Sequence, residues 1–152
     1  MINNSLHSSI KFGKNSTMKK LLSTSYPEWA FDTMMFLIRI SCGGLMLANH
    51  GFQKLVKFNS LQHVFSDPFH IGSKWSLVLV IFAEVFCSLL VIAGLFTRVA
   101  VIPLVISTGV AFFIAHDHDI NKGEAAAMFM TGFLAILLCG PGRASIDRMM
   151  GH

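Results

Sequence analysis

The chain has 152 residues, of which 53% are hydrophobic and only 13% are charged. Soluble globular proteins carry roughly 25% charged residues, so this composition excludes an ordinary soluble domain and indicates a single membrane domain. The formal net charge is only +4, and no basic stretch is interleaved with aromatic residues, so we predict no nucleic-acid partner. The lipid bilayer is the first partner that the composition implies.

The N-terminal segment, residues 1–28, is expected to be a disordered polar tail. Its first part is rich in Asn and Ser, and Met18 opens a stretch that itself looks like a protein start. No apolar core of signal-peptide length follows the basic residues, so we predict no cleaved signal. The sequence does not decide whether Met1 or Met18 is the true start.

Four apolar segments come near the roughly 20 residues that a membrane-spanning helix needs. They predict an all-α integral membrane four-helix bundle over residues 29–148, followed by a short tail over 149–152. Gly94 is expected to end the second span and Thr97 to cap the third, and so short a connection predicts antiparallel neighbours. The predicted spans cover residues 31–58, 76–95, 99–115 and 124–140.

The distribution of Lys and Arg predicts the orientation in the membrane. The N-terminal tail, the turn between the second and third spans, and the C-terminal segment lie on one side of a four-span protein. Together they carry more Lys and Arg than the two loops on the opposite side. Because positive charge is enriched in cytoplasmic loops, we expect both termini in the cytoplasm.

A ladder of polar residues follows the first predicted span. At 100° per residue, Arg39, Gly43, His50 and Lys54 fall on one face of a helix, with Gln53 at its edge. Charges at membrane depth usually face a bundle interior or a wet cavity, so this stripe is a candidate functional site. Lys54 could instead extend to the outer headgroups, and Gly43 could simply allow close helix packing.

Glu84 is the other charge deep in an apolar segment. Helical rise places it between the depths of Arg39 and His50, so we predict that Arg39 and Glu84 form a buried polar pair. Such a pair would lock the bundle. Alternatively, Glu84 would be a carboxyl that carries a proton or binds a ligand.

A second polar cluster, "HDHD", follows the third span, and His116 reaches about the depth of His50. His and carboxylate side chains suit divalent metals, and two histidines at one depth could hold a haem. A His-Asp-His-Asp run at a loop mouth is more often solvated polar sequence, so we predict no metal site. We predict instead a ligand-binding cluster at the outer end of the bundle. Its members are His50, Gln53, Lys54, His116 and Glu124.

Several segments resemble the signature segments of the DoxX family over residues 31–148. They are "RISCGGLMLANHGFQKL", "FAEVFCSLLVIAGLFTRVA", the histidine after the third span and "GPGRASID". The resemblance implies a four-helix, multi-pass protein of the bacterial inner membrane. Some members are similar to subunits of thiosulfate:quinone oxidoreductases, others are linked to membrane-associated oxidative-stress complexes, and many have no assigned activity. The polar positions that match the family pattern are Arg39, His50, Gln53, Lys54, Glu84, Arg98, His116 and Glu124.

Three functions remain open from the sequence. The first is a membrane subunit of a quinone- or sulfur-linked redox system, in which the polar stripe binds a quinone-like ligand. The sequence contains no cysteine cluster, flavin fingerprint or haem motif, so no cofactor is encoded by motif and electrons would have to come from another redox protein. The second is a non-enzymatic membrane scaffold or partner protein. The third is a small-molecule or proton carrier, which would need to form a homo-oligomer. The sequence does not decide whether the chain is catalytic.

Overall fold

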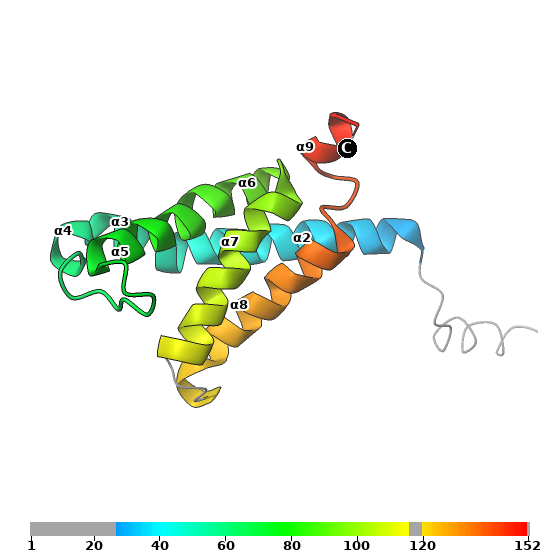
Figure 1. Cartoon of the computed structure of the whole chain (residues 1–152). Coiled ribbons are helices and arrows are strands. Elements are labelled where there is room, and N and C mark those ends of the chain that lie inside the picture. The colour runs from blue at the N-terminus through cyan, green and yellow to red at the C-terminus, as the bar shows by residue number, and fades with distance from the viewer. Residues whose placement is uncertain (1–26, 116–119, 152) are drawn as a thin grey trace, which may run out of the picture.

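The computed structural model describes residues 27–115 and 120–151, and the regular structure within these ranges is helical (Figure 1). The polar tail expected over residues 1–28 lies outside the described residues except for its last two. Residues 116–119, which include His116, also lie outside them.

Two long helices form the first half of the structure, and each is interrupted by one π-helical turn. The first runs from Glu28 to Val56 and the second from Ser73 to Ala93. The first comprises α2 (Glu28–Met46), the π turn η1 (Leu47–Gly51) and α3 (Phe52–Val56). The second comprises α5 (Ser73–Ile81), the π turn η2 (Phe82–Cys87) and α6 (Ser88–Ala93).

The second half is a helical hairpin followed by a short C-terminal helix. The first helix of the hairpin ends in a third π turn. Gly94, with φ of 71°, ends α6, the helix that precedes the hairpin, as predicted. The elements are α7 (Thr97–Val110), η3 (Ala111–Ala115), α8 (Ile120–Cys139) and α9 (Ile146–Met149). A further short helix, α4 (Phe58–Leu61), follows α3.

The connection between α4 and α5 is organised by one carboxylate. Asp67 accepts hydrogen bonds from the backbone N–H groups of Ile71 (3.1 Å) and Gly72 (2.7 Å) and from Ser76 Oγ (2.8 Å). Burial by itself would raise the pKa of the Asp67 carboxyl, but these hydrogen bonds favour the charged form and lower its pKa. The carboxylate thereby fixes the chain at the start of α5.

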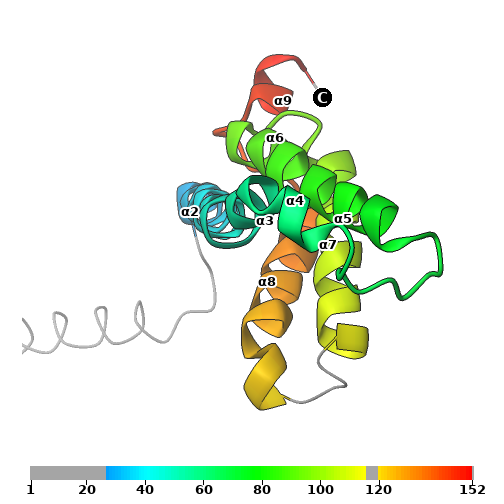
Figure 2. The same cartoon turned by 90° about the vertical axis from the view of Figure 1, so that its left-hand side faces the viewer.

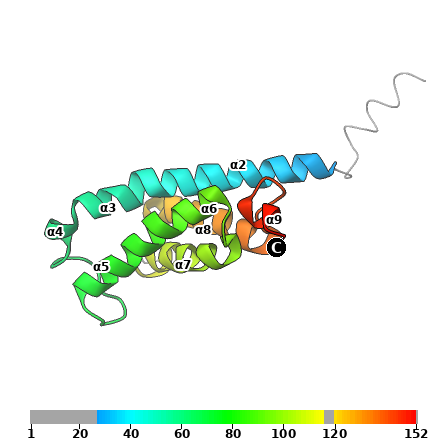
Figure 3. The ribbon, with the colours of Figure 1, turned by 90° about the horizontal axis from the view of Figure 1, so that it is seen from above.

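The two halves of the structure cross rather than run parallel. Figure 1 shows α2–α3 lying along α5–α6, whereas the hairpin of α7, η3 and α8 slants away from this pair. Figure 2, which looks toward the α3–α4 end, shows α7 and α8 side by side below the pair. In Figure 3, α2 extends past the end of α6, and α9 lies beside this overhang.

One apolar core joins the four long helices. Every helix contributes buried side chains to it, so the bundle has a single interior rather than two separate pairs. The core residues are Met35, Met46, Cys87, Val91, Ala100, Val101, Leu104, Phe133 and Ile136.

The outer surface of the bundle is strongly apolar. Among the residues that the structure describes, three helices are long and apolar enough to cross a bilayer, and α8 contains a shorter apolar stretch from Gly123 to Cys139. Large side chains such as Phe86, Ile106 and Leu138 are exposed, as expected for groups that face lipid. Trp29, 70% exposed, lies at the start of the first helix, where an interfacial anchor belongs. The fold is therefore that of a multi-pass membrane protein.

Glycines set the register between the first two helices. A Cβ at Gly51 would lie 2.7 Å from the Glu84 carbonyl oxygen, and one at Gly43 would lie 2.8 Å from Ile92 Cγ1. A Cβ at Gly94, which follows α6 at the end of the second helix, would lie 2.6 Å from Arg39 Nη1. Small residues therefore let the two backbones approach closely, which is a common device in membrane helix packing. The contacts also place Gly51 opposite Glu84 and Arg39 opposite Gly94.

Candidate functional site

The centre of the candidate site is an ion pair between the first two helices. Lys54 Nζ lies 2.6 Å from Glu84 Oε1 and 2.5 Å from Oε2. The Glu84 residue is only 5% exposed, whereas the Lys54 side chain is 24% exposed. Ser107 Oγ, from α7, lies 3.5 Å from Glu84 Oε1 and adds a weak hydrogen bond. Three helices thus meet at the Glu84 carboxylate.

Two π turns pack against each other at this site. His50 and Gly51 belong to η1, and Glu84 belongs to η2. Residues buried on the first helix are Met35, Arg39, Gly43, Met46 and Gly51, so the buried positions recur every three or four residues until the π turn makes the last step five. The extra residue places Gly51 against η2 and leaves His50 half-buried at the edge. Single π turns inside α-helices often occur at functional sites because they redirect side chains in this way.

A small cavity lies beside the ion pair. It has a volume of about 230 Å³, below the range of about 300–1,000 Å³ that is typical of drug-sized ligands. His50, Gln53 and Lys54 all line it, together with Asn49, Lys57 and Leu61. The structure therefore brings three of the five predicted ligand-binding residues to one cavity.

The fourth helix reaches this site through an aromatic ring. The ring of Phe129, on α8, meets the His50 imidazole edge-on, with ring centroids 5.5 Å apart. Phe129 also stacks on Phe133, which belongs to the apolar core. One side of His50 is therefore fixed by packing.

Glu124, a fourth predicted site residue, does not line this cavity. Glu124 lies near the start of α8, is exposed, and makes no hydrogen bond or ion pair to any residue that the structure describes. The prediction requires residues at the same depth on different helices to lie together. Because α7 and α8 slant away from α2 (Figure 1), the outer end of α8 does not meet the end of α3. His116 lies outside the described residues. Within residues 27–115 and 120–151, no group of three His, Cys, Asp or Glu residues is placed to hold a metal ion.

The predicted pair of Arg39 and Glu84 is wrong. Arg39 is 1% exposed and donates from Nη1 to the Pro141 carbonyl and from Nη2 to the Ala144 carbonyl, both at 2.7 Å. The predicted pair requires both spans to begin at the same level, but α2 overhangs the end of α6 (Figure 3). Arg39 lies opposite Gly94, twelve residues or about 18 Å along the helix from Gly51. Lys54 is therefore the residue that reaches Glu84.

Arg39 instead holds the C-terminal segment against the end of the bundle. Asp147 in this segment accepts hydrogen bonds from the backbone N–H groups of Phe96 (2.6 Å) and Thr97 (2.9 Å). Its own N–H donates to the Gly94 carbonyl at 2.9 Å. The prediction that Thr97 caps α7 is also wrong, because Phe96 is the N-cap and the Asp147 carboxylate satisfies the first amides. Asp147 is a structural residue that the sequence reasoning missed.

The DoxX family profile matches residues 34–117, more than half of the chain. The chain belongs to the DoxX family. The matched region contains the Lys54–Glu84 ion pair, both packed π turns and all the residues that line the cavity. A comparison with curated proteins found no match to this DoxX chain, and a comparison with solved structures found none either.

Ser107 and Phe129 are the other contributors to the site of this DoxX protein that the sequence reasoning missed. Ser107 belongs to an apolar face of α7, and Phe129 is one of 14 phenylalanines in the chain. Neither has a sequence signal that separates it from ordinary packing residues. Their roles follow from the crossing of the helices, which residue spacing does not reveal.

Proposed function

We propose that this DoxX protein is a membrane subunit of a redox system and that it binds a quinone-like head group at the cavity formed by His50, Gln53 and Lys54. The observation that carries the proposal is this cavity, of about 230 Å³, which lies beside the Lys54–Glu84 ion pair. Its volume suits a single ring rather than a large cofactor, and an apolar tail could extend into the lipid.

The donors and acceptors around the cavity match the oxygens of a quinone. A neutral imidazole such as His50 donates from one nitrogen and accepts at the other, and the Gln53 amide also does both. Quinone carbonyls accept hydrogen bonds, whereas quinol hydroxyls donate as well as accept. The pair His50 and Gln53 therefore suits both redox states of such a ligand.

The ion pair next to the cavity supports a role in proton handling. A quinone takes up two electrons and two protons when it becomes a quinol. His50 is half-buried and Glu84 is held by Lys54 and Ser107, so both are ionisable groups in a position to exchange protons near the ring. The electrons would come from a partner redox protein. We place this subunit in the bacterial inner membrane with both termini in the cytoplasm.

A second candidate function is a non-enzymatic scaffold. It is favoured by the fact that Arg39 on α2 and Lys54 on α3 both find partners within the chain, Arg39 in the C-terminal segment and Lys54 in η2. On this alternative, the polar groups hold the bundle together and the exposed faces dock other membrane proteins. The two functions differ in whether a small molecule stays with the purified protein.

The test is to purify the protein in mild detergent, extract it and identify bound small molecules by mass spectrometry. We expect a stoichiometric quinone in the wild type and in His63→Leu, a matched histidine control that is exposed and does not line the cavity. We expect His50→Leu to lose it with little change in thermal stability, because the His50 side chain makes no hydrogen bond to another described residue and packs edge-on against Phe129. Retention of only bulk lipid by the wild type would favour the scaffold.

A further inference from the structure

A second, larger cavity lies at the opposite end of the first helix from His50. Its volume is about 780 Å³, within the range of known ligand sites. It lies under the overhang of α2, between the start of α7, the end of α8 and the C-terminal segment. Its lining includes Phe31, Phe96, Arg98, Val99, Arg143 and Arg148.

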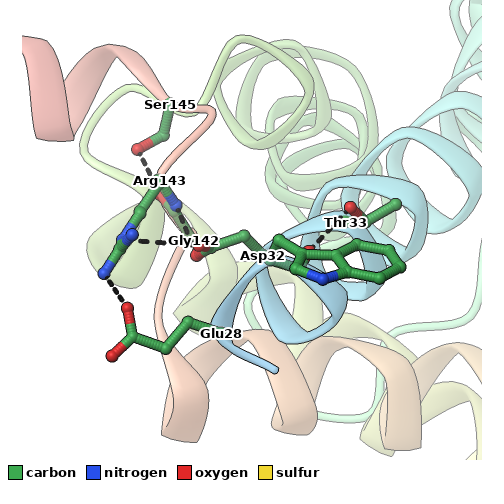
Figure 4. Close-up of polar contacts among 7 residues, drawn as sticks. Glu28, Asp32, Thr33, Gly142, Arg143 and Ser145 are labelled. Carbon is green, nitrogen blue, oxygen red and sulfur yellow. Dashed lines mark hydrogen bonds and ion pairs between the residues drawn. The ribbon is translucent and has the colours of Figure 1, made fainter. Parts of the chain in front are cut away.

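The acidic groups around this cavity are already engaged. Arg143 forms ion pairs with Glu28 and Asp32, and its backbone N–H donates to Asp32 Oδ1 at 3.0 Å (Figure 4). Asp147 accepts from the first amides of α7. The carboxylates in the lining are thus paired with Arg143 or with backbone amides.

Two arginines of the lining are not neutralised in this way. No hydrogen bond or ion pair joins the side chain of Arg98 or Arg148 to another residue within the described parts of the chain. The Arg98 guanidinium lies over Gly140, where an added Cβ would be 3.3 Å from Nη2. A planar guanidinium with free donors is suited to bind phosphate or carboxylate oxygens.

A buried hydroxyl provides an independent sign of a missing polar partner. Thr97 lines the cavity and is 0% exposed, and its Oγ1 has no hydrogen-bond partner among the residues that the structure describes. Buried hydroxyls in proteins are usually hydrogen-bonded, to protein or to an ordered molecule. The amides at the start of α7 are occupied by Asp147, so the helix terminus itself is not the feature that would bind an anion.

The position of the cavity indicates which kind of anion it meets. It lies where two membrane-spanning helices begin, at Glu28 and Thr97, and where the apolar stretch of α8 ends, at Cys139. This is the level of the lipid headgroups. Val99, 67% exposed, and the exposed ring of Phe96 add apolar surface beside Arg98.

We propose that this cavity binds the phosphate-bearing headgroup of an anionic phospholipid. Arg98 and Arg148 would hold the phosphate oxygens, and the acyl chains would lie along Phe96 and Val99. The site is separate from the His50 cavity and does not depend on the proposed redox function.

The experiment uses native mass spectrometry of the full chain after incubation with phosphatidylglycerol or phosphatidylcholine. We expect selective retention of phosphatidylglycerol by the wild type. Arg98→Gln and Arg148→Gln should each reduce its occupancy about tenfold or more, the usual contribution of a hydrogen bond to a charged group. Lys74→Gln removes the same charge at the other end of the protein and should retain the lipid. Arg98→Lys, which keeps the charge, should bind at an intermediate level.

Two outcomes would overturn the proposal. One is equal retention of both lipids, or retention that both arginine variants leave unchanged. The other is a thermal stabilisation by inorganic phosphate as large as that by phosphatidylglycerol, which would make the ligand a soluble anion. Because Arg148 is exposed on α9, Arg148→Gln keeps the test valid even if Arg98→Gln fails to fold.

Discussion

Glu84→Gln is expected to lower the free energy of unfolding by about 2–4 kcal/mol. Removing one partner of a buried ion pair typically costs about 3–5 kcal/mol, because the other charge is left uncompensated. The cost is lower here because the Lys54 side chain is 24% exposed and because glutamine still accepts a hydrogen bond. Reversible unfolding in mixed detergent micelles measures the change.

A double-mutant cycle identifies the partner of Glu84. Adding Lys54→Met to Glu84→Gln should recover part of the lost stability, because the uncompensated ammonium is gone. Adding Arg39→Met should give an additive loss, because Arg39 lies about 18 Å away along the helix. Coupling to Arg39 and additivity with Lys54 would show that the arrangement described here is wrong.

Arg39→Met is expected to lower the free energy of unfolding by about 2–4 kcal/mol and to release the C-terminal segment. Arg39 is buried and makes two hydrogen bonds of 2.7 Å to the carbonyls of Pro141 and Ala144. Hydrogen bonds to charged groups contribute about 1.5–3 kcal/mol each, and the loss is partly offset because a buried charge is also removed. Limited proteolysis should then cleave after Arg143 or Arg148 much faster than in the wild type.

Arg39→Lys is the informative control for this change. Lysine keeps the positive charge but lacks the planar pair of donors that reaches two carbonyls at once. We expect it to restore less than half of the lost stability and to leave the segment sensitive to protease. Wild-type protection in Arg39→Met would mean that the contacts of Asp147 and Arg143 hold the segment without Arg39.

The sequence predicted the apolar helices, the stop at Gly94 and the family well, because these depend on local composition and spacing. It also predicted that His50, Gln53 and Lys54 lie together, because they are neighbours on one helix. The partner of Glu84 was not predictable, since it depends on how far α2 slides along α6. That register is set by the close contacts at Gly43, Gly51 and Gly94.

Two other features required the three-dimensional structure. The π turn η1 changes the helical phase, so Gly51 takes the inner position and His50 lies at the edge of a cavity. The slant of α7 and α8 separates Glu124 from that cavity even though its helical rise suggested otherwise (Figure 1). Neither the π turn nor the slant of the two helices is accompanied by a marked change in the residue pattern, so the sequence does not reveal them.

The central claim is that a quinone-like ligand binds at the cavity lined by residues of η1, α3 and α4. Photolabelling with a light-activated quinone analogue, followed by peptide mapping, tests its position most directly. We predict that the label falls within residues 47–61, that excess unlabelled quinone prevents it, and that His50→Leu abolishes it while His63→Leu does not. Label spread evenly over the lipid-facing helices, or label that persists in His50→Leu, would contradict the claim.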